Sequence, residues 1–377
     1  MNILIVGTAY PLRGGIAHYN ALLAYHLKKN HTVATITFKR QYPAFLFPGK
    51  TQEESAGSYR TEPAPQLIDS INPFNWIAIG REIRRRNPDL IIFKYWLPFF
   101  GPCFGTIAKV AKRGTRTKVL FICDNVIPHE RRPGDVLFTR YAFRQADYFV
   151  VQSNAVEKDL LANFPGVKYR NVPHPVYDLF GAPLAKDEAR RRLGITQKRV
   201  ILYFGYVRQY KGLMVLIDAM KLIGDSANMA DTLLLAVGEC YDDETRYRDR
   251  IRALGLEQRI RFVSDYVPND QVQLYFSAAD VVALPYLSAT QSGITQIAYS
   301  FDKPVIATNV GGLAEVVLDE ETGYVVEPNS PAALANAVER FYRDNRETAF
   351  VANVRREKQK YSWENLVRQI EALVGNE

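Results

Sequence analysis

The sequence has few cysteines, no long apolar run and no leader-like start. Only three cysteines occur in its 377 residues, at Cys103, Cys123 and Cys240. They match no metal-binding or disulfide spacing, which favours a reducing cytosol. No run of about 18 apolar residues occurs, and the best candidate, Leu90 to Val110, is interrupted by two lysines, two prolines and two glycines. Met1 directly precedes strand-like residues, so we expect a cytoplasmic chain without a signal peptide or membrane span.

The chain also lacks the dinucleotide-binding signature G-x-G-x-x-G. The first expected strand is followed by a loop that ends in Gly14-Gly15, and paired glycines let a backbone approach a ligand closely. The second strand ends in Lys39 and Arg40, not in the acidic residue that binds a ribose. Both features count against NAD. The alternatives are an NADP-dependent Rossmann enzyme and a plain turn that needs a glycine at positive φ.

Short β-branched runs alternate with amphipathic stretches twice along the chain. With 47% hydrophobic and 23% charged residues, the composition is that of a globular protein. The expected strands of the first series are Asn2–Val6, Thr32–Phe38, Leu90–Phe93, Lys118–Cys123 and Tyr148–Val151. Those of the second series are Val200–Phe204, Thr232–Val237, Arg259–Val263, Val281–Leu284 and Val305–Ala307. The predicted fold class is therefore α/β, with two Rossmann-like doubly wound domains that face a central cleft.

The net charge of +8 is unevenly distributed. Residues 1–185 hold 24 Lys and Arg against 13 Asp and Glu, and the remaining residues hold 24 against 27. A basic first half suggests an acidic partner, but no interleaved aromatic motif supports nucleic acid. The long segment Gln41–Pro65 carries Tyr42, Phe45, Leu46 and Phe47. It fits either a peripheral contact with anionic membrane or a lid over the cleft.

Two cations stand three residues apart in the run Gly205-Tyr206-Val207-Arg208-Gln209-Tyr210-Lys211-Gly212. The run separates the strand Val200–Phe204 from a helical stretch that begins at Leu213. A helix N-terminus with an added Arg and Lys favours a diphosphate. The alternative is a solvated basic turn.

Two further segments follow expected strands. Asp124, Asn125, His129 and Glu130 come after Lys118–Cys123, at the end of the sheet where α/β sites assemble. His129 with Glu130 could form an acid/base pair, although adjacent residues often point apart. After Val281–Leu284, the run Gln291-Ser292-Gly293 provides small residues at a helix start, which favours a nest of N–H donors.

The order of these motifs resembles the family 4 glycosyltransferases, which are two-domain GT-B enzymes. The resemblance rests on four motifs in order: Gly14-Gly15, Gly205 with Lys211-Gly212, Lys303-Pro304-Val305-Ile306-Ala307, and Gly311-Gly312-Leu313-Ala314-Glu315. It implies an acceptor domain over residues 1–180, a nucleotide-sugar donor domain over residues 185–358, and a terminal helix over residues 359–377 that crosses back to the first domain.

The resemblance also implies roles for individual residues. Arg208 and Lys211 would hold the diphosphate, and Asp124 and His129 would complete the catalytic set. The implied donor-binding residues are Gly14, Gly15, Gly205, Tyr266, Val267, Gln291, Ser292, Gly293 and Gln296. The reaction would transfer a hexosyl group to a glycan or lipid-linked acceptor, with retention at the anomeric carbon and with neither a cofactor nor a metal.

The sequence departs from the family at four positions. The family's two glutamates eight residues apart are Ala289 and Ile297 here, with Gln291 and Gln296 as polar neighbours. Where the family has an arginine directly after the glycine that corresponds to Gly205, this sequence has Tyr206. Where the family has a histidine after the fourth strand of the first domain, this sequence has Asp124. A nucleotide-sugar-binding protein that has lost catalysis is therefore the alternative function.

Overall fold

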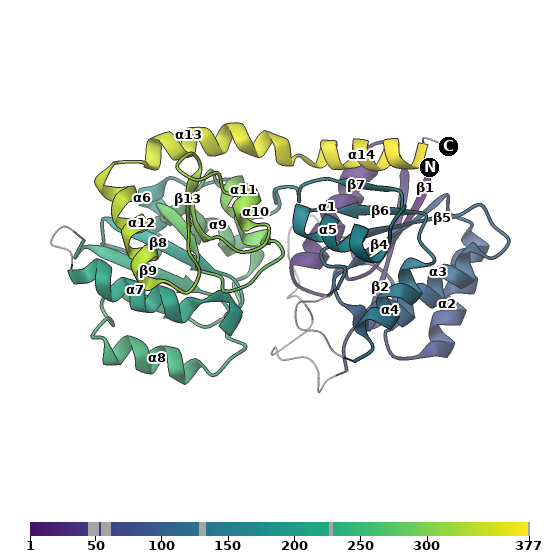
Figure 1. Ribbon diagram of the computed structural model, residues 1–377, viewed down its shortest axis with the longest axis horizontal. Helices are drawn as coiled ribbons and strands as arrows, with labels where there is room; N and C mark the ends of the chain where they lie inside the picture. Colours follow the sequence, from purple (N-terminus) through teal and green to yellow (C-terminus); the bar gives the residue numbers. More distant parts are fainter. Residues whose placement is uncertain (44–52, 54–61, 128–132, 226–228, 376–377) are drawn as a thin grey trace. The chain divides into compact units, whose positions relative to one another are not determined.

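The computed structural model describes residues 1–43, 53, 62–127, 133–225 and 229–375. The chain forms two compact units, of which the first contains Met1–Pro175 with Ser362–Glu377 and the second contains Val176–Tyr361 (Figure 1). The expected domain limits, residues 1–180, 185–358 and 359–377, stay predictions. The predicted fold class, two Rossmann-like α/β domains, is confirmed. The cleft between them stays a prediction. His129 and the apolar residues Phe45, Leu46 and Phe47 lie outside the described residues.

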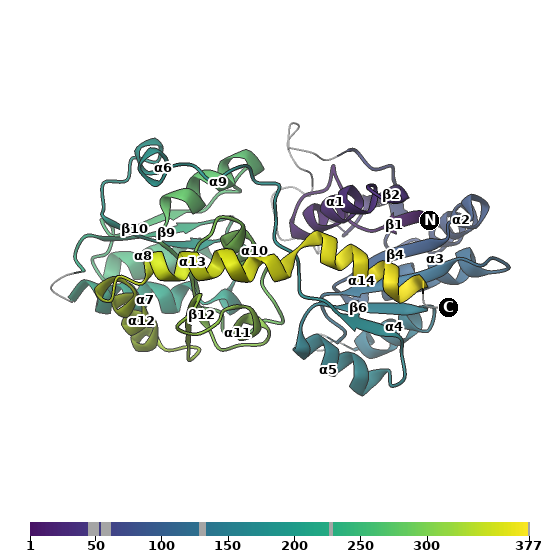
Figure 2. The same cartoon turned by 90° about the horizontal axis from the view of Figure 1, so that it is seen from above.

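Within the described residues, the first unit has a seven-stranded parallel sheet in the order β3-β2-β1-β4-β5-β6-β7. Its strands are β1 (Asn2–Val6), β2 (Thr32–Arg40), β3 (Gln66–Asp69), β4 (Leu90–Tyr95), β5 (Lys118–Cys123), β6 (Tyr148–Val151) and β7 (Tyr169–Asn171). Its helices are α1 (Gly15–Leu27), α2 (Pro73–Arg86), α3 (Gly101–Lys112), α4 (Asp135–Phe143), α5 (Asn154–Asn163) and α14 (Trp363–Gly375). Helices α2, α3 and α4 pack side by side on one face, and α1 and α14 lie together on the other (Figures 1 and 2).

The second unit has a six-stranded parallel sheet in the order β10-β9-β8-β11-β12-β13 within the described residues. Its strands are β8 (Arg199–Phe204), β9 (Thr232–Val237), β10 (Ile260–Val263), β11 (Val281–Leu284), β12 (Val305–Thr308) and β13 (Gly323–Val326). Its helices are α6 (Lys186–Arg192), α7 (Leu213–Asp225), α8 (Glu244–Ala253), α9 (Asn269–Ala278), α10 (Gly293–Ser300), α11 (Leu313–Val316), α12 (Pro331–Arg343) and α13 (Glu347–Glu357). Helix α7 packs against α12, and α6 packs against α9 across the sheet from them (Figure 2).

Three of these strands were not expected from the sequence. β3, β7 and β13 have only three or four residues each and lie at the edges of the sheets. Such short runs carry too little periodicity to stand out from loops. They extend the sheets without changing the predicted fold class.

Each sheet reverses its strand order once. β1 pairs with both β2 and β4, and β8 pairs with both β9 and β11. Strand order reverses at these two places, and ligands of open α/β sheets bind outside the carboxyl ends of strands at such points. The fold therefore directs attention to the loops after β1, β4, β8 and β11.

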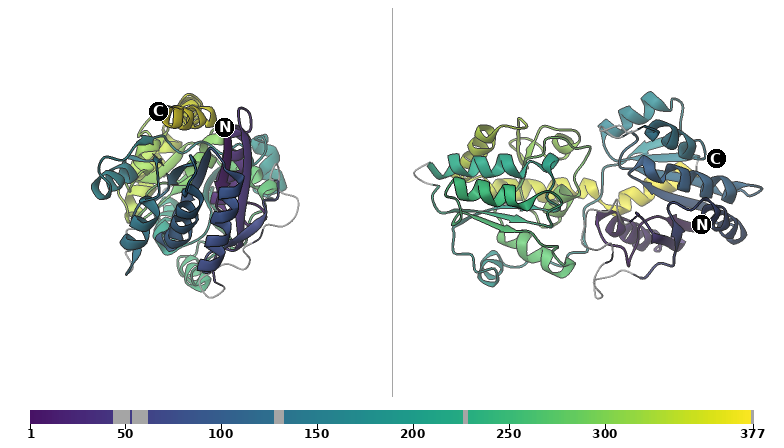
Figure 3. Two further views of the ribbon diagram at one scale, coloured as in Figure 1. Left: turned by 90° about the vertical axis from the view of Figure 1, so that its right-hand side faces the viewer. Right: turned by 90° about the horizontal axis from the view of Figure 1, so that it is seen from below.

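Helix α14 belongs to the first unit through an aromatic contact. The Trp363 ring is 3% exposed, stacks on His26 with ring centroids 5.6 Å apart, and meets Tyr19 at 5.1 Å. Helix α14 ends near the N-terminal strand (Figure 3), where Glu371 Oε1 lies 2.9 Å from His31 Nε2. The terminal helix is thus packed into the core of this unit.

We predict that Trp363→Ala lowers the free energy of unfolding of the first unit by about 3–5 kcal/mol, because it removes a buried aromatic side chain. Urea denaturation followed by tryptophan fluorescence measures this, since the other two tryptophans, Trp76 and Trp96, also lie in this unit. Glu364→Ala is the control. Its side chain is 65% exposed, so the ion pair with Lys29 contributes less than about 1 kcal/mol. Equal losses in both variants would contradict the packing role.

Candidate functional site

The loop after β1 brings its glycines to the start of α1. Gly14 has φ of 110° and immediately precedes α1, a conformation that favours glycine, and Gly15 is the first helical residue. The loop is fixed to its surroundings because Thr37 Oγ1 accepts from the Ala9 N–H at 2.9 Å and Asn20 Nδ2 donates to the Thr8 carbonyl at 2.9 Å. The first turn of α1 holds no acidic residue, so its positive dipole end is suited to an anion.

Asp124 lies at the same edge of the first sheet, directly after β5. Its N–H donates to the Tyr95 carbonyl at 2.9 Å, and its carboxylate pairs with Lys94 Nζ at 2.6 Å. The structure therefore brings Gly14, Gly15 and Asp124 to the carboxyl edge of one sheet. Sequence reasoning missed Lys94, although a lysine inside the apolar run of β4 was a signal for a buried charge.

In the second unit, the Gly205–Gly212 turn is held against the neighbouring loops. The Val207 N–H donates to the Glu239 carbonyl at 2.9 Å, and the Tyr241 N–H donates to the Val207 carbonyl at 3.0 Å. Gly212 has φ of 69°, and a Cβ there would lie 1.8 Å from the Pro285 carbonyl oxygen. Only glycine allows the turn to pack this closely against the end of β11.

Lys211 is the most informative residue of this turn. Its side chain is 9% exposed, and among the described residues no carboxylate forms an ion pair with it. Burial, with the Arg208 charge as the second cause, lowers the pKa of Lys211 to about 8. A buried ammonium group without an anionic partner is costly unless a ligand supplies the negative charge.

The ammonium group of Lys211 lies beside the first turn of α10. A Cβ built on Gly205 would be 3.3 Å from Lys211 Nζ and 3.1 Å from Ile294 Cδ1, so both groups adjoin the same point. Ser292 caps this helix by accepting from the Ile294 N–H at 3.2 Å. Gly293 is the first helical residue. Lys211 and the positive end of α10 thus lie at one small region.

Arg208 is supported by tyrosines. Its guanidinium carbon lies 4.9 Å from the centroid of the Tyr241 ring, and Tyr206 stacks on Tyr241 with centroids 4.7 Å apart. Lys211 Nζ similarly lies 5.7 Å from the centroid of the Tyr286 ring. Each clamp cation therefore faces the π-system of a different tyrosine.

The remaining predicted donor residues take different positions in the second unit. Tyr266 and Val267 follow β10. The carboxyl end of β10 is joined to that of β9, because the Gly238 N–H donates to the Val263 carbonyl at 2.9 Å. Gln291 immediately precedes the capping Ser292. Gln296 is 2% exposed within α10, and its Oε1 accepts no hydrogen bond from the described residues. The roles of all four in donor binding stay predictions.

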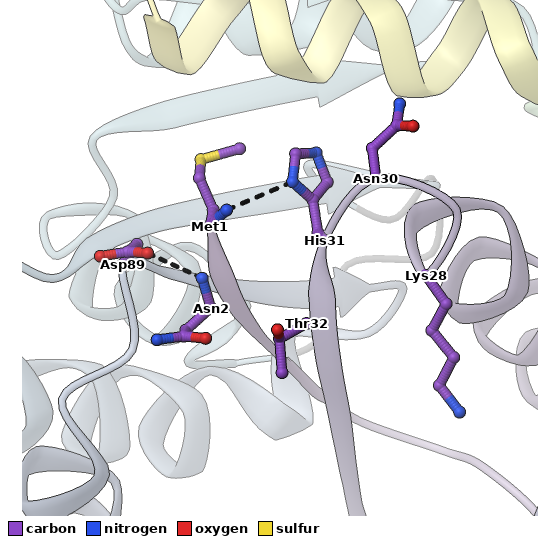
Figure 4. A pocket seen from close by; sticks show the side chains of 7 residues that line it. All are labelled: Met1, Asn2, Lys28, Asn30, His31, Thr32 and Asp89. Carbon is purple, nitrogen blue, oxygen red and sulfur yellow. Dashed lines mark hydrogen bonds between the residues drawn. The ribbon is translucent and has the colours of Figure 1, made fainter.

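An open polar pocket lies at the opposite edge of the first sheet (Figure 4). Its lining residues are Met1, Asn2, Lys28, Asn30, His31, Thr32 and Asp89. Asp89 Oδ2 accepts from the Asn2 N–H at 2.7 Å, and the Met1 amine lies 3.4 Å from His31 Nδ1. These residues precede or begin strands, so the pocket is separate from the carboxyl edge that carries Gly14 and Asp124.

Residues 198–344 match the family model described as group 1 glycosyl transferases. The matched residues lie within the second unit. The resemblance recognised in the sequence is thereby confirmed at the level of group 1, whereas membership of family 4 stays a prediction.

Among relatives, the D-inositol 3-phosphate glycosyltransferase of Corynebacterium glutamicum is 32% identical over 202 residues, or 51% of this chain and 48% of that protein. The putative glycosyltransferase YtcC of Bacillus subtilis is 32% identical over 186 residues, or 48% of this chain and 45% of that protein. The aligned part spans about half the length of these curated relatives.

Solved structures extend the similarity of fold to the whole chain. Anabaena HepE in complex with UDP superposes with a TM-score of 0.76 at 18% identity, covering 100% of both chains. The sucrose-phosphate synthase of Thermosynechococcus elongatus gives a TM-score of 0.75 at 21% identity, covering 99% of this chain and 98% of that one. At these identities the likeness concerns the fold.

We predict that Lys211→Met stabilises the ligand-free protein at pH 7. A folded pKa near 8, against 10.5 in the unfolded chain, corresponds to about 3 kcal/mol of unfavourable folding free energy. Because the unfolded chain binds more protons between pH 8 and 10.5, wild-type stability rises with pH across that range. The stability of the variant does not rise in this way, and its advantage over the wild-type protein is largest below pH 8. Chemical denaturation at pH 7 and pH 10 measures both effects.

Lys303→Met is the matched control for this prediction. Burial also lowers the pKa of Lys303 to about 8, but its Nζ donates to the Ala279 carbonyl at 2.8 Å. Removing Lys303 leaves that buried carbonyl unpaired, which offsets the gain. A Lys211→Met protein less stable than the wild type at pH 7 would show that the ammonium group has a structural partner.

Proposed function

We propose that the protein is a glycosyltransferase that moves a hexosyl group from a nucleoside-diphosphate sugar to a glycan or lipid-linked acceptor. The observation that carries the proposal is the buried Lys211 beside the start of α10, with which no carboxylate of the described residues forms an ion pair, within the segment that matches the group 1 model. HepE, a protein of the same fold, is described in complexes with UDP and with UDP-glucose, which supports a donor of this class.

The clamp provides the chemistry that this reaction needs most. Negative charge grows on the nucleoside diphosphate as the glycosidic bond breaks, so fixed cations stabilise the transition state more than the ground state. Arg208 and Lys211 would supply two such charges, and the positive end of α10 would supply a partial one. With this charge compensation we propose that no metal ion is required.

We further propose that the anomeric configuration is retained. The departing diphosphate oxygen would take the proton of the acceptor hydroxyl, so that no separate protein base is needed at the anomeric carbon. Asp124 would then act on sugar hydroxyl groups at the first unit's edge. The role of His129 as an acid or base stays a prediction.

The lysine of the clamp provides the test of function. We predict that Lys211→Ala lowers kcat about 10²–10³-fold, the typical loss on removing one group that stabilises developing charge. Transfer and donor hydrolysis are measured with a panel of nucleotide sugars, and proton NMR of the product gives its anomeric configuration. Lys303→Met is again the control and retains turnover.

Three outcomes would contradict this proposal in different ways. Unchanged turnover in Lys211→Ala would remove the clamp assignment. A wild-type protein that gains thermal stability with UDP-sugars, but neither transfers nor hydrolyses them, would be the catalytically inactive binding protein. Hydride transfer to NADP would identify the Rossmann enzyme considered from the sequence.

The acceptor side of the proposal includes contact with an anionic membrane. None of the helices among the described residues is long and apolar enough to cross a bilayer. However, Phe74 at the start of α2 is 84% exposed, and Leu137 at the start of α4 is 68% exposed. Helix α3 packs between α2 and α4, so these apolar side chains flank one edge of the basic first unit. Such a surface suits peripheral binding at a lipid headgroup layer.

We predict that the wild-type protein co-sediments with anionic vesicles, and that Phe74→Asp and Leu137→Asp each weaken this binding about 10-fold, because one apolar side chain no longer enters the interface. Leu161→Asp is the control, as Leu161 is 39% exposed on α5, away from this edge. Binding should fall with added salt. Wild-type binding that is absent, or insensitive to both salt and the two substitutions, would contradict the membrane contact.

A further inference from the structure

Lys94 is a charged side chain in the interior of the first sheet. It is the penultimate residue of β4 and is 1% exposed. Its Nζ donates to Gln152 Oε1 at 2.7 Å and pairs with Asp124 Oδ1 at 2.6 Å. The same atom lies 3.7 Å from the centroid of the Tyr19 ring. These three contacts of the ammonium group are all with polar or π-electron partners.

The four residues come from four different elements at one edge of the sheet. Lys94 lies one residue before the end of β4, Asp124 follows β5, Gln152 follows β6, and Tyr19 lies on α1 after β1. Gln152 Nε2 also donates to the Tyr19 hydroxyl at 3.0 Å, which closes the cluster. β1 and β4 are the neighbours at which the strand order reverses, so the cluster lies where ligands of such sheets bind.

Stability alone does not account for this pair. Removing two charges from water costs more than their attraction returns unless the geometry is excellent, and apolar residues of similar size often serve better. The two partners also differ in access to solvent. The Lys94 side chain is 2% exposed, whereas that of Asp124 is 16% exposed. The cation is behind the carboxylate, and the carboxylate reaches the surface.

We propose that Lys94 is a positioning residue that holds Asp124 as a fixed carboxylate for binding a sugar hydroxyl group. A carboxylate only accepts hydrogen bonds, and a hydroxyl donates one, so the match is chemical. The ion pair and the Gln152 and Tyr19 contacts fix both the charge and the direction of the carboxylate. The inference rests on the proposed glycosyl transfer and assigns Asp124 a partner within its own unit.

Two titratable groups beside the pair, His174 and Cys123, are uncharged between pH 5 and pH 8. Burial, with Lys94 as the next cause, lowers the pKa of His174 to about 4, and burial raises the pKa of the Cys123 thiol. The Tyr19 ring faces Lys94 from α1. His174 and Cys123 therefore keep a constant charge across that pH range.

The test is a double-mutant cycle with Lys94→Met, Asp124→Asn and the combined variant. Each single variant leaves one buried charge without its partner, so we expect a lower Tm, together with a loss of kcat/KM of about 10²-fold. The combined variant buries neither charge and recovers its Tm, but its kcat/KM stays about as low as in Asp124→Asn, because the carboxylate is still absent. In Lys94→Met the acid limb of the kcat/KM profile moves to higher pH, since Asp124 has lost its counter-charge.

The control is a second Lys–Asp pair in the same unit. Lys112 Nζ lies 2.7 Å from Asp147 Oδ2, and Asp147 precedes β6 at the opposite edge of the sheet. Lys112→Met with Asp147→Asn should change Tm without changing kcat/KM. Donor hydrolysis without acceptor then identifies the sugar. If Asp124→Asn loses donor hydrolysis, Asp124 binds a hydroxyl group of the donor sugar. If hydrolysis is unchanged but transfer is lost, Asp124 binds a hydroxyl group of the acceptor.

Two results would overturn the inference. Recovery of kcat/KM along with Tm in the combined variant would make the pair purely structural. Losses that multiply across the two single variants, with an unmoved pH profile, would show that Lys94 does not act through Asp124. Failure of the proposed function is distinct, because the wild-type protein itself would then transfer no sugar from any nucleotide donor.

Discussion

Burying an ammonium group is costly, and this constraint determines the surroundings of the lysines at the carboxyl edges of both sheets. Lys94 is compensated within the protein by Asp124 and Gln152. Lys303 is held by the Ala279 carbonyl. Lys211 has the same depressed pKa as Lys303, about 8, yet no anionic partner among the described residues. Because a charge left in this state destabilises the fold, the structure around Lys211 is best explained by a ligand that brings the missing negative charge.

The fold positions these charges through one topological rule applied twice. β4 and β8 both border a reversal of strand order. β4 carries Lys94 near its carboxyl end, and β8 precedes the turn that carries Lys211. Helix starts at Gly15 and Gly293 add positive dipole ends at the same edges. Lys94 lies within a strand, and the turn that carries Lys211 is held against the end of β11 by Gly212. Rigid placement of this kind is what preorganised electrostatic stabilisation requires.

The sequence predicted the alternation of strands and helices, and the structure confirms it because long buried runs such as Leu90–Tyr95 have few other solutions. The turn at Arg208 and Lys211 could be recognised because its glycines and cations are adjacent in the chain. Lys94 could not, because its partners lie 30 to 75 residues away and meet only when β1, β4, β5 and β6 align. For the same reason, the tyrosines facing the clamp cations were not predicted. Pairings between distant strands set these contacts, and local patterns do not contain them.

The tyrosines also give a physical account of the departure at Tyr206. Where the resemblance leads one to expect an arginine, Tyr206 stacks on Tyr241, and that ring in turn lies under the Arg208 guanidinium. The cation stands two residues later in the chain, at Arg208. Tyr206, at the position where the arginine is expected, supports it through the stack with Tyr241. A guanidinium over a ring keeps its hydrogen-bond donors free for a planar or forked acceptor while losing little solvation. The substitution therefore preserves a charge at this edge of the sheet and changes the means by which it is held.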